Sequence, residues 1–253
     1  FFFNDTATTE IYTFPYTTLF RSAVATAFRQ NGTDANNNVK ADIAALGIPA
    51  ERIRVHHTGV DLTRFAPRDQ GAAKAALGIA GPLVVSVGAL IPRKGHDIVI
   101  DAVAALPGVQ LRIAGEGPER PRLAAQIARL GLDERVKLLG SVAHAELPPL
   151  LAAADAMALA SSSEGLANAW VEALASGTPI VIPDAGAARE VVTRHAAGRI
   201  VARDPASFAT GIAAVLSQPV DPAATRATVD AYSWERNALE LRDHLIALVG
   251  QKG

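Results

Sequence analysis

The sequence predicts an α/β protein built on a doubly wound, Rossmann-like parallel sheet. Its 253 residues, 49% of them apolar, are enough to bury a sizeable core. From residue 39 onward, short apolar runs of strand length alternate with segments of helical periodicity or with turns rich in glycine and proline. This alternation is typical of parallel strands that helices cover on both faces, and it therefore predicts a doubly wound sheet.

Strand-length apolar runs define the expected sheet. In chain order they are 53–56, 83–88, 111–114, 136–139, 156–159, 180–182 and 199–201. Ligands of such sheets bind beyond the carboxyl ends of the strands. The loops that follow the strands are therefore expected to line one cleft, and they are 88–95, 115–120, 140–142, 161–165 and 184–186.

Residues 1–22 differ in composition from the rest of the chain. They hold seven of the thirteen aromatic residues, whereas alanine, which is abundant later, appears there only at Ala7. This head lacks the basic region and continuous apolar core of a secretory signal, and it resembles translated sequencing-adapter read-through. We expect it to be spurious or disordered, with an atypical β-hairpin as the alternative. Residues 23–50 are expected to be the remnant of an inter-domain region.

The composition argues against several classes of function. A formal net charge of −1 without long runs of like charge provides no basic surface, so no nucleic-acid partner is expected. The absence of cysteine excludes disulfides and thiolate chemistry and fits a cytoplasmic location. No apolar run reaches the roughly 18 to 20 residues that a membrane-spanning helix requires.

No metal site is expected from the sequence. Asp-x-Asp, His-x-x-x-His and Glu-x-x-His spacings are all absent. The histidines are therefore expected at the surface or in loops rather than as metal ligands, and they are His56, His57, His96, His144, His195 and His244.

The segment 163–179 carries the strongest signal of a ligand site. It sets Glu164 and Glu172 eight positions apart, across a loop and an apolar helix expected over 168–175. Most of that helix should be buried, and an ionised Glu172 there requires a hydrogen-bonding partner. Glu164 precedes the helix beside the Gly165 turn, where unpaired backbone N–H groups favour phosphate or polyol oxygens. A sugar and a phosphate both fit such a site.

A series of motifs extends this signal along the chain. They are Thr58-Gly59-Val60-Asp61 with Phe65, Gly88 with Arg93-Lys94-Gly95, Gly115-Glu116-Gly117-Pro118, Gly140-Ser141-Val142, Glu164 and Glu172, and Gly177-Thr178-Pro179. On these motifs, the chain from about residue 39 to about residue 249 resembles the retaining nucleotide-sugar glycosyltransferases of the GT-B fold, the family 4-like enzymes or glycosyl transferases group 1.

The resemblance implies a domain organisation. In that family two Rossmann-like domains face each other, and these motifs belong to the carboxyl-terminal domain, which binds the nucleotide-sugar donor. A donor-binding domain is thus implied over 51–233, followed over 234–253 by a C-terminal helix that packs towards an acceptor domain absent from this chain. That absent domain would also provide any peripheral association with the inner face of a membrane.

The resemblance also implies roles for single residues. Arg93 and Lys94 would neutralise the leaving diphosphate in place of a metal ion, because fixed cations there stabilise the transition state more than the ground state. Glu164 would contact sugar hydroxyls as a third catalytic residue, and Glu172 would accept hydrogen bonds from the ribose. The remaining donor-binding positions are Gly88, Gly115, Val142, Gly165, Leu166, Ala167 and Asn168.

Each assignment has a simpler alternative. Arg93 and Lys94 would then be a solvated loop pair, Glu172 a structural charge and Glu164 an acid at a helix N-terminus. The chain also departs from the family at Ala187, which follows Gly186 where the family often has two glycines. Its methyl group would crowd a close backbone contact there.

The leading hypothesis is transfer of a hexose from a nucleotide-diphosphate sugar to a glycan or lipid-linked acceptor, with retention of configuration and without a metal or another cofactor. This donor half would be inactive alone, so a nucleotide-sugar-binding module without turnover is the first alternative. A sugar-nucleotide epimerase of the same architecture is the second. An NAD-dependent oxidoreductase is the third, but Pro118 and the residues after it stand where the Gly-x-Gly-x-x-Gly motif needs its last glycine.

Overall fold

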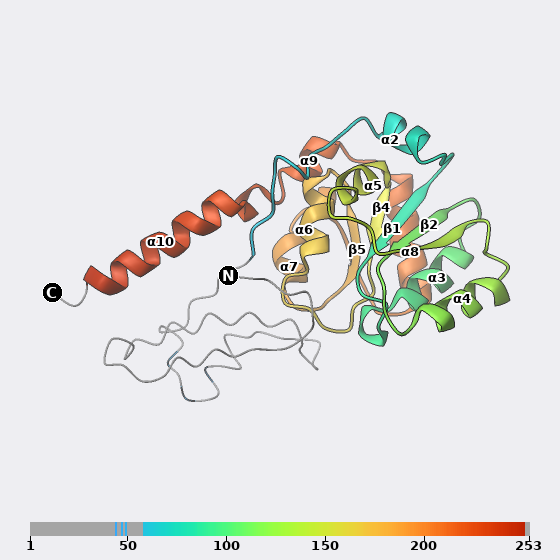
Figure 1. The fold of residues 1–253 in the computed structure, drawn as a ribbon, viewed down its shortest axis with the longest axis horizontal. Helices are drawn as coiled ribbons and strands as arrows, with labels where there is room; N and C mark the ends of the chain where they lie inside the picture. Colours follow the sequence, from blue (N-terminus) through green and yellow to red (C-terminus); the bar gives the residue numbers. More distant parts are fainter. Residues whose placement is uncertain (1–43, 45–46, 48, 50–57, 251–253) are drawn as a thin grey trace.

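The computed structural model describes residues 44, 47, 49 and 58–250, and it contains a six-stranded parallel sheet. The strand order, β3-β2-β1-β4-β5-β6, is that of doubly wound dinucleotide-binding folds (Figure 1). The strands are β1 (Leu83–Val87), β2 (Gln110–Ala114), β3 (Val136–Gly140), β4 (Ala156–Ala158), β5 (Ile180–Pro183) and β6 (Gly198–Val201). Six expected strands are thereby confirmed. The run at 53–56, the head at 1–22 and most of 23–50 lie outside the described residues.

The central strands are apolar along their length because the sheet is buried on both faces. In β1, Leu83 and Val85 join one hydrophobic cluster, while Val84 between them joins the other. All three side chains are fully buried. A strand with this environment has no face for polar residues, which explains the near-continuous apolar runs in the sequence.

Helices pack on both faces of the sheet (Figure 1). Those that contribute to the cluster around Val84 are α3 (His96–Ala104), α4 (Arg120–Arg129) and α8 (Pro205–Ser217). Those that contribute to the cluster around Leu83 are α5 (Leu147–Ala153), α6 (Asn168–Ala175) and α7 (Ala188–Val191). Shorter elements are α2 (Gln70–Ala76), η3 (Pro92–Lys94), η4 (His195–Ala197), α9 (Pro222–Arg226) and η5 (Asp230–Tyr232).

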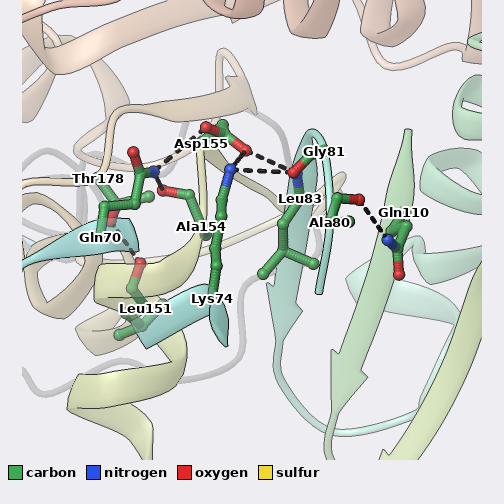
Figure 2. A network of polar contacts seen from close by, with 10 residues as sticks. All are labelled: Gln70, Lys74, Ala80, Gly81, Leu83, Gln110, Leu151, Ala154, Asp155 and Thr178. Carbon is green, nitrogen blue, oxygen red and sulfur yellow. Dashed lines mark hydrogen bonds and ion pairs between the residues drawn. The ribbon is translucent and has the colours of Figure 1, made fainter. Parts of the chain in front are cut away.

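A polar network around Asp155 lies at the amino-terminal ends of β1 and β4 (Figure 2). One oxygen of this carboxylate, Oδ2, accepts hydrogen bonds from Lys74 Nζ and from the backbone N–H of Leu83, both at 2.6 Å. The other, Oδ1, accepts from Gln70 Nε2 at 3.2 Å. Because α2 has no fully buried residue, these polar contacts, together with the packing of Ala73 against the core, hold it in place.

The last helix, α10 (Trp234–Gly250), extends away from the sheet (Figure 1). It corresponds to the C-terminal helix expected over 234–253. Its start is held where the backbone N–H of Val60 donates to Tyr232 O at 2.8 Å. Further along, Leu239, Leu245 and Ile246 are 49%, 49% and 63% exposed. Its packing towards an acceptor domain stays a prediction. Within the described part of the chain, no helix is long and apolar enough to cross a membrane.

The exposed apolar positions of α10 predict self-association, since contiguous apolar patches of several hundred Å² are usually interaction sites. We expect Leu245→Asp to lower self-association in light scattering while changing the free energy of unfolding by less than about 0.5 kcal/mol, as surface substitutions usually do. Leu151→Asp, at a fully buried position of α5, is the destabilising control. Equal destabilisation by both variants would contradict the exposure of this face.

Candidate functional site

The sheet has one point at which its strand order reverses, between β1 and β4. The chain leaves β1 for α3 on one face of the sheet, and it leaves β4 for α6 on the other. The polypeptide therefore turns to opposite faces of the sheet after these two strands, and the crevice beyond the carboxyl ends at such a point is where doubly wound sheets bind their ligands. Two of the loops expected to line a cleft, 88–95 and 161–165, lie at this crevice.

These two loops touch through their backbones. Gly95 has a left-handed conformation with φ of 64°, and a Cβ atom added there would lie 2.2 Å from Ala160 O. The backbone N–H of Ser162 donates to Arg93 O at 2.8 Å. From the loop after β6, Arg203 Nε donates to the same Ala160 O at 2.7 Å. The turn that carries Arg93 and Lys94 is thus fixed against the end of β4.

The contact brings both predicted cations onto Glu164. Lys94 Nζ lies 2.5 Å from Glu164 Oε1, and Arg93 Nη1 lies 3.6 Å from Oε2. Arg93 Nη1 also donates to Ser163 O. The Glu164 side chain is 7% exposed, so its charge needs these partners. Arg93 and Lys94 together carry one positive charge more than Glu164 neutralises, which favours an anionic ligand beside them. The sequence predicted that these residues face one cleft, but not that they pair with one another.

The turn after Glu164 is supported by the loop that follows β5. Gly186, with φ of 54°, lies so close that an added Cβ would be 2.1 Å from Glu164 O. The backbone N–H of Ala187 donates to Gly165 O at 2.8 Å. Ala187 therefore holds this turn through its backbone. Asp184, at the start of the loop 184–186 that was expected to line the cleft, is paired with Arg189 on the surface.

The helix α6 begins directly after this turn and matches the helix expected over 168–175. Leu166 and Ala167 lead into it, and Ala167, the N-cap, makes no side-chain capping hydrogen bond. The first-turn N–H groups are therefore not occupied by a capping side chain, as an anion-binding helix start requires. The side chain of Asn168 accepts a hydrogen bond from Thr58 Oγ1 at 2.7 Å.

One turn into α6, Glu172 has the partner that its burial demands. His144 Nε2, from the loop after β3, lies 3.2 Å from Glu172 Oε1. Burial raises the pKa of Glu172 above its ordinary value, and the hydrogen bond to His144 opposes this shift. Neither His144 nor Arg64, which lies 2.8 Å from the imidazole, was predicted from the sequence as part of the site.

The loops after β1, β2 and β3 form a continuous edge beside these residues. The backbone N–H of Gly88 donates to Ala114 O at 3.0 Å, and that of Gly115 donates to Gly140 O at 2.8 Å. A Cβ at Gly115 would lie 1.9 Å from Gly88 O, so only glycine permits this contact. Val142 follows in the next loop, half-buried against the cluster that contains α6. Its predicted contact with a nucleotide base stays a prediction.

His96 was expected at the surface or in a loop, and this expectation is wrong. It is the first residue of α3 and is 2% exposed. Its Nε2 lies 3.3 Å from Gly88 O and its Nδ1 lies 3.0 Å from Ser86 Oγ. Because a carbonyl oxygen only accepts, Nε2 carries the proton and Nδ1 accepts from the serine hydroxyl. The buried Ser86 hydroxyl thus provides the hydrogen-bond partner that the buried imidazole requires.

Within residues 58–250 and the other described positions, no group of three His, Asp or Glu side chains is placed to hold a metal ion. His144 and His195 are exposed, whereas His56 and His57 lie outside the described residues.

The family model and the curated relatives that match this chain are both of glycosyltransferases. Residues 69–234 match the family model described as glycosyl transferases group 1. The chain is 37% identical over 222 residues to a D-inositol 3-phosphate glycosyltransferase of Mycolicibacterium vanbaalenii, which covers 79% of this chain and 48% of that protein. For the same-named protein of Nocardia farcinica, the identity is 36% and the covered shares are 67% and 41%. The chain thus spans less than half the length of these relatives.

Solved structures share the fold. Sucrose-phosphate synthase from Thermosynechococcus elongatus superposes with a TM-score of 0.74 and 25% identity over 86% of this chain and 58% of that one. Anabaena Alr3699/HepE, solved in complex with UDP, gives a TM-score of 0.74 and 27% identity over 85% of this chain and 63% of that one.

The buried imidazole predicts a pH dependence of stability. Burial lowers the pKa of His96 from 6.5 to about 4, so between these values the unfolded chain binds a proton that the folded chain does not. The contribution of His96 to the free energy of unfolding is therefore complete above pH 6.5. It falls by about 3 kcal/mol as the pH falls towards 4. In urea unfolding, the free energy of unfolding should change less between pH 7 and pH 4.5 for His96→Gln than for the wild type. His195→Gln, at an exposed position hydrogen-bonded to Gln218, should keep the wild-type dependence, and equal changes in all three proteins would contradict this account.

Proposed function

The chain belongs to the glycosyl transferases group 1, and we propose that it is the donor-binding half of a GT-B hexosyltransferase that uses a nucleotide-diphosphate sugar. The proposed reaction transfers the hexose to a glycan or lipid-linked acceptor, with retention of configuration and without a metal ion. One observation carries the proposal: a buried Glu164 is held between Arg93 and Lys94 at the point where the strand order reverses. That crevice is where a doubly wound sheet binds its ligand.

The charges of this crevice suit the chemistry of sugar transfer. When the glycosidic bond to the donor breaks, negative charge builds up on the departing β-phosphate. Fixed cations at that position stabilise the transition state more than the ground state. Lys94 and Arg93 are largely buried, at 15% and 21% exposure, so their interaction with a phosphate is less screened than at an open surface. Glu164 orients both cations and presents oxygens to the hydroxyl groups of the sugar.

The acceptor half would come from a second domain. The chain spans less than half the length of the curated relatives it matches, and in a GT-B enzyme the acceptor binds on the opposite wall of the cleft. The proposed enzyme acts in the cytoplasm, with any contact to the inner face of a membrane made by that second domain. A nucleotide-sugar-binding module without turnover is the alternative for this chain alone, and product formation separates the two.

The chain alone is predicted to bind a nucleoside diphosphate but to transfer no sugar. Productive geometry needs groups from both walls of the cleft, and a misplacement of about 1 Å costs about 100-fold in rate. Calorimetry with UDP, GDP and ADP measures the binding, and product analysis with the corresponding hexose donors measures transfer. A folded chain that binds none of the three would overturn the donor-site proposal, whereas rapid transfer would overturn the need for a second domain.

When an acceptor domain is joined to this chain, Lys94→Ala should lower kcat/KM by roughly 100-fold or more. That is the order expected for the loss of one group that stabilises a developing anion. Lys74→Ala is the matched control, because Lys74 also pairs with a carboxylate, Asp155, but at the opposite edge of the sheet.

The same enzyme should keep its rate in EDTA. If EDTA abolished transfer and Mg²⁺ or Mn²⁺ restored it, the metal-independent mechanism would be wrong, whatever the effect of Lys94→Ala.

A further inference from the structure

A chain of polar contacts links α6 to the segment that leads into the domain. Glu172 Oε1 lies 3.2 Å from His144 Nε2, and His144 Nδ1 lies 2.8 Å from Arg64 Nη1. The three residues come from α6, from the loop after β3 and from the turn 61–65. Their sequence separations are 28 and 80 residues, so the contact is made only by the fold.

The protonation of His144 follows from its neighbours. A guanidinium group has donors only, so Arg64 donates to Nδ1, which must carry no proton. In the neutral imidazole the proton then lies on Nε2, which donates to the Glu172 carboxylate. Arg64 thus selects the tautomer of His144 that can hold Glu172.

The support beneath Arg64 is itself fixed. Asp61 Oδ1 accepts hydrogen bonds from the backbone N–H groups of Thr63 and Arg64, each at 3.0 Å. Phe65, which is 1% exposed, places its ring edge-on to the His144 ring, with centroids 5.3 Å apart. The imidazole is therefore held by a charge on one side and by a buried aromatic ring on another.

We propose that His144, fixed by Arg64, is a positioning residue that aims the Glu172 carboxylate at the ribose hydroxyls of a bound nucleoside diphosphate. The inference rests on the proposed function, which places the nucleotide along this edge of the cleft. Within the described part of the structure, Oε1 of Glu172 has a hydrogen bond to the protein and Oε2 has none. Oε2 is therefore available to the ligand. At 14% side-chain exposure, a carboxylate without that contact would turn towards solvent.

The test compares ribose recognition with overall binding. For whichever of UDP, GDP and ADP binds best, calorimetry on the 253-residue chain gives the ratio of its Kd to those of its 2′-deoxy and 3′-deoxy analogues. The wild type should prefer the ribonucleotide by about tenfold or more, the range of a hydrogen bond to a charged group. His144→Leu should reduce this preference to about that of Glu172→Gln, and Arg64→Met should reduce it in part.

A conservative variant and a matched control separate positioning from general damage. His144→Gln keeps an acceptor for Arg64 and a donor for Glu172, so it should retain most of the preference. His195→Leu removes another exposed histidine that contacts an arginine, Arg199, at the amino end of β6, and it should change nothing.

The outcomes are distinct. If the folded wild type binds none of the three nucleotides, the donor-site proposal fails and this inference fails with it. If the wild type binds but has no ribose preference, the ribose contact of Glu172 and the role of His144 are both overturned, while the donor site stands. If His144→Leu keeps the preference, only the role of His144 is overturned. Loss of the preference in His144→Leu together with its recovery in His144→Gln supports it.

Discussion

The site depends on one constraint: the loops after β1 and β4 must touch through their backbones. This contact places Gly95 against the carbonyl of Ala160, where an added Cβ would be only 2.2 Å from the oxygen. Any side chain would push the two loops apart. Arg93 and Lys94 precede Gly95 directly, so such a shift would remove them from Glu164 on the other loop. The cluster of Arg93, Lys94 and Glu164 therefore depends on glycine at position 95, because only glycine lets the two loops approach this closely.

The two glutamates of the site lie on one helix and the turn before it, yet their environments differ. Glu164 is buried beside two cations, Arg93 and Lys94. Glu172 is buried beside a histidine whose tautomer is set by an arginine, and burial raises its pKa. One carboxylate thus has two cationic partners, and the other has a histidine. Under the proposed function, these two identical side chains would serve different parts of one ligand, Glu164 near the phosphates and sugar and Glu172 towards the nucleoside.

The sequence predicts the centre of the sheet well because burial on both faces leaves β1, β4 and β5 almost without polar positions. The α6 boundaries and the need of Glu172 for a partner follow from the same physics. The identity of that partner does not, because His144 is 28 residues away and Arg64 lies further still, and a single sequence gives no sign of such contacts. His96 was misplaced for a related reason: its burial depends on Ser86, a polar residue on a strand that otherwise reads as apolar.

The segments at the two ends of the described domain are in contact with each other. The segment that leads into the domain pairs with the segment that leads out, where the N–H of Val60 donates to Tyr232 O. Gly59 packs against Trp234 at the start of α10 so closely that a Cβ would lie 2.7 Å from its backbone. The same incoming segment carries Thr58 and Arg64, which reach α6 and His144. The phosphate side of the proposed site therefore rests on the sheet, while its nucleoside side rests on the segments that connect this domain to the rest of the chain.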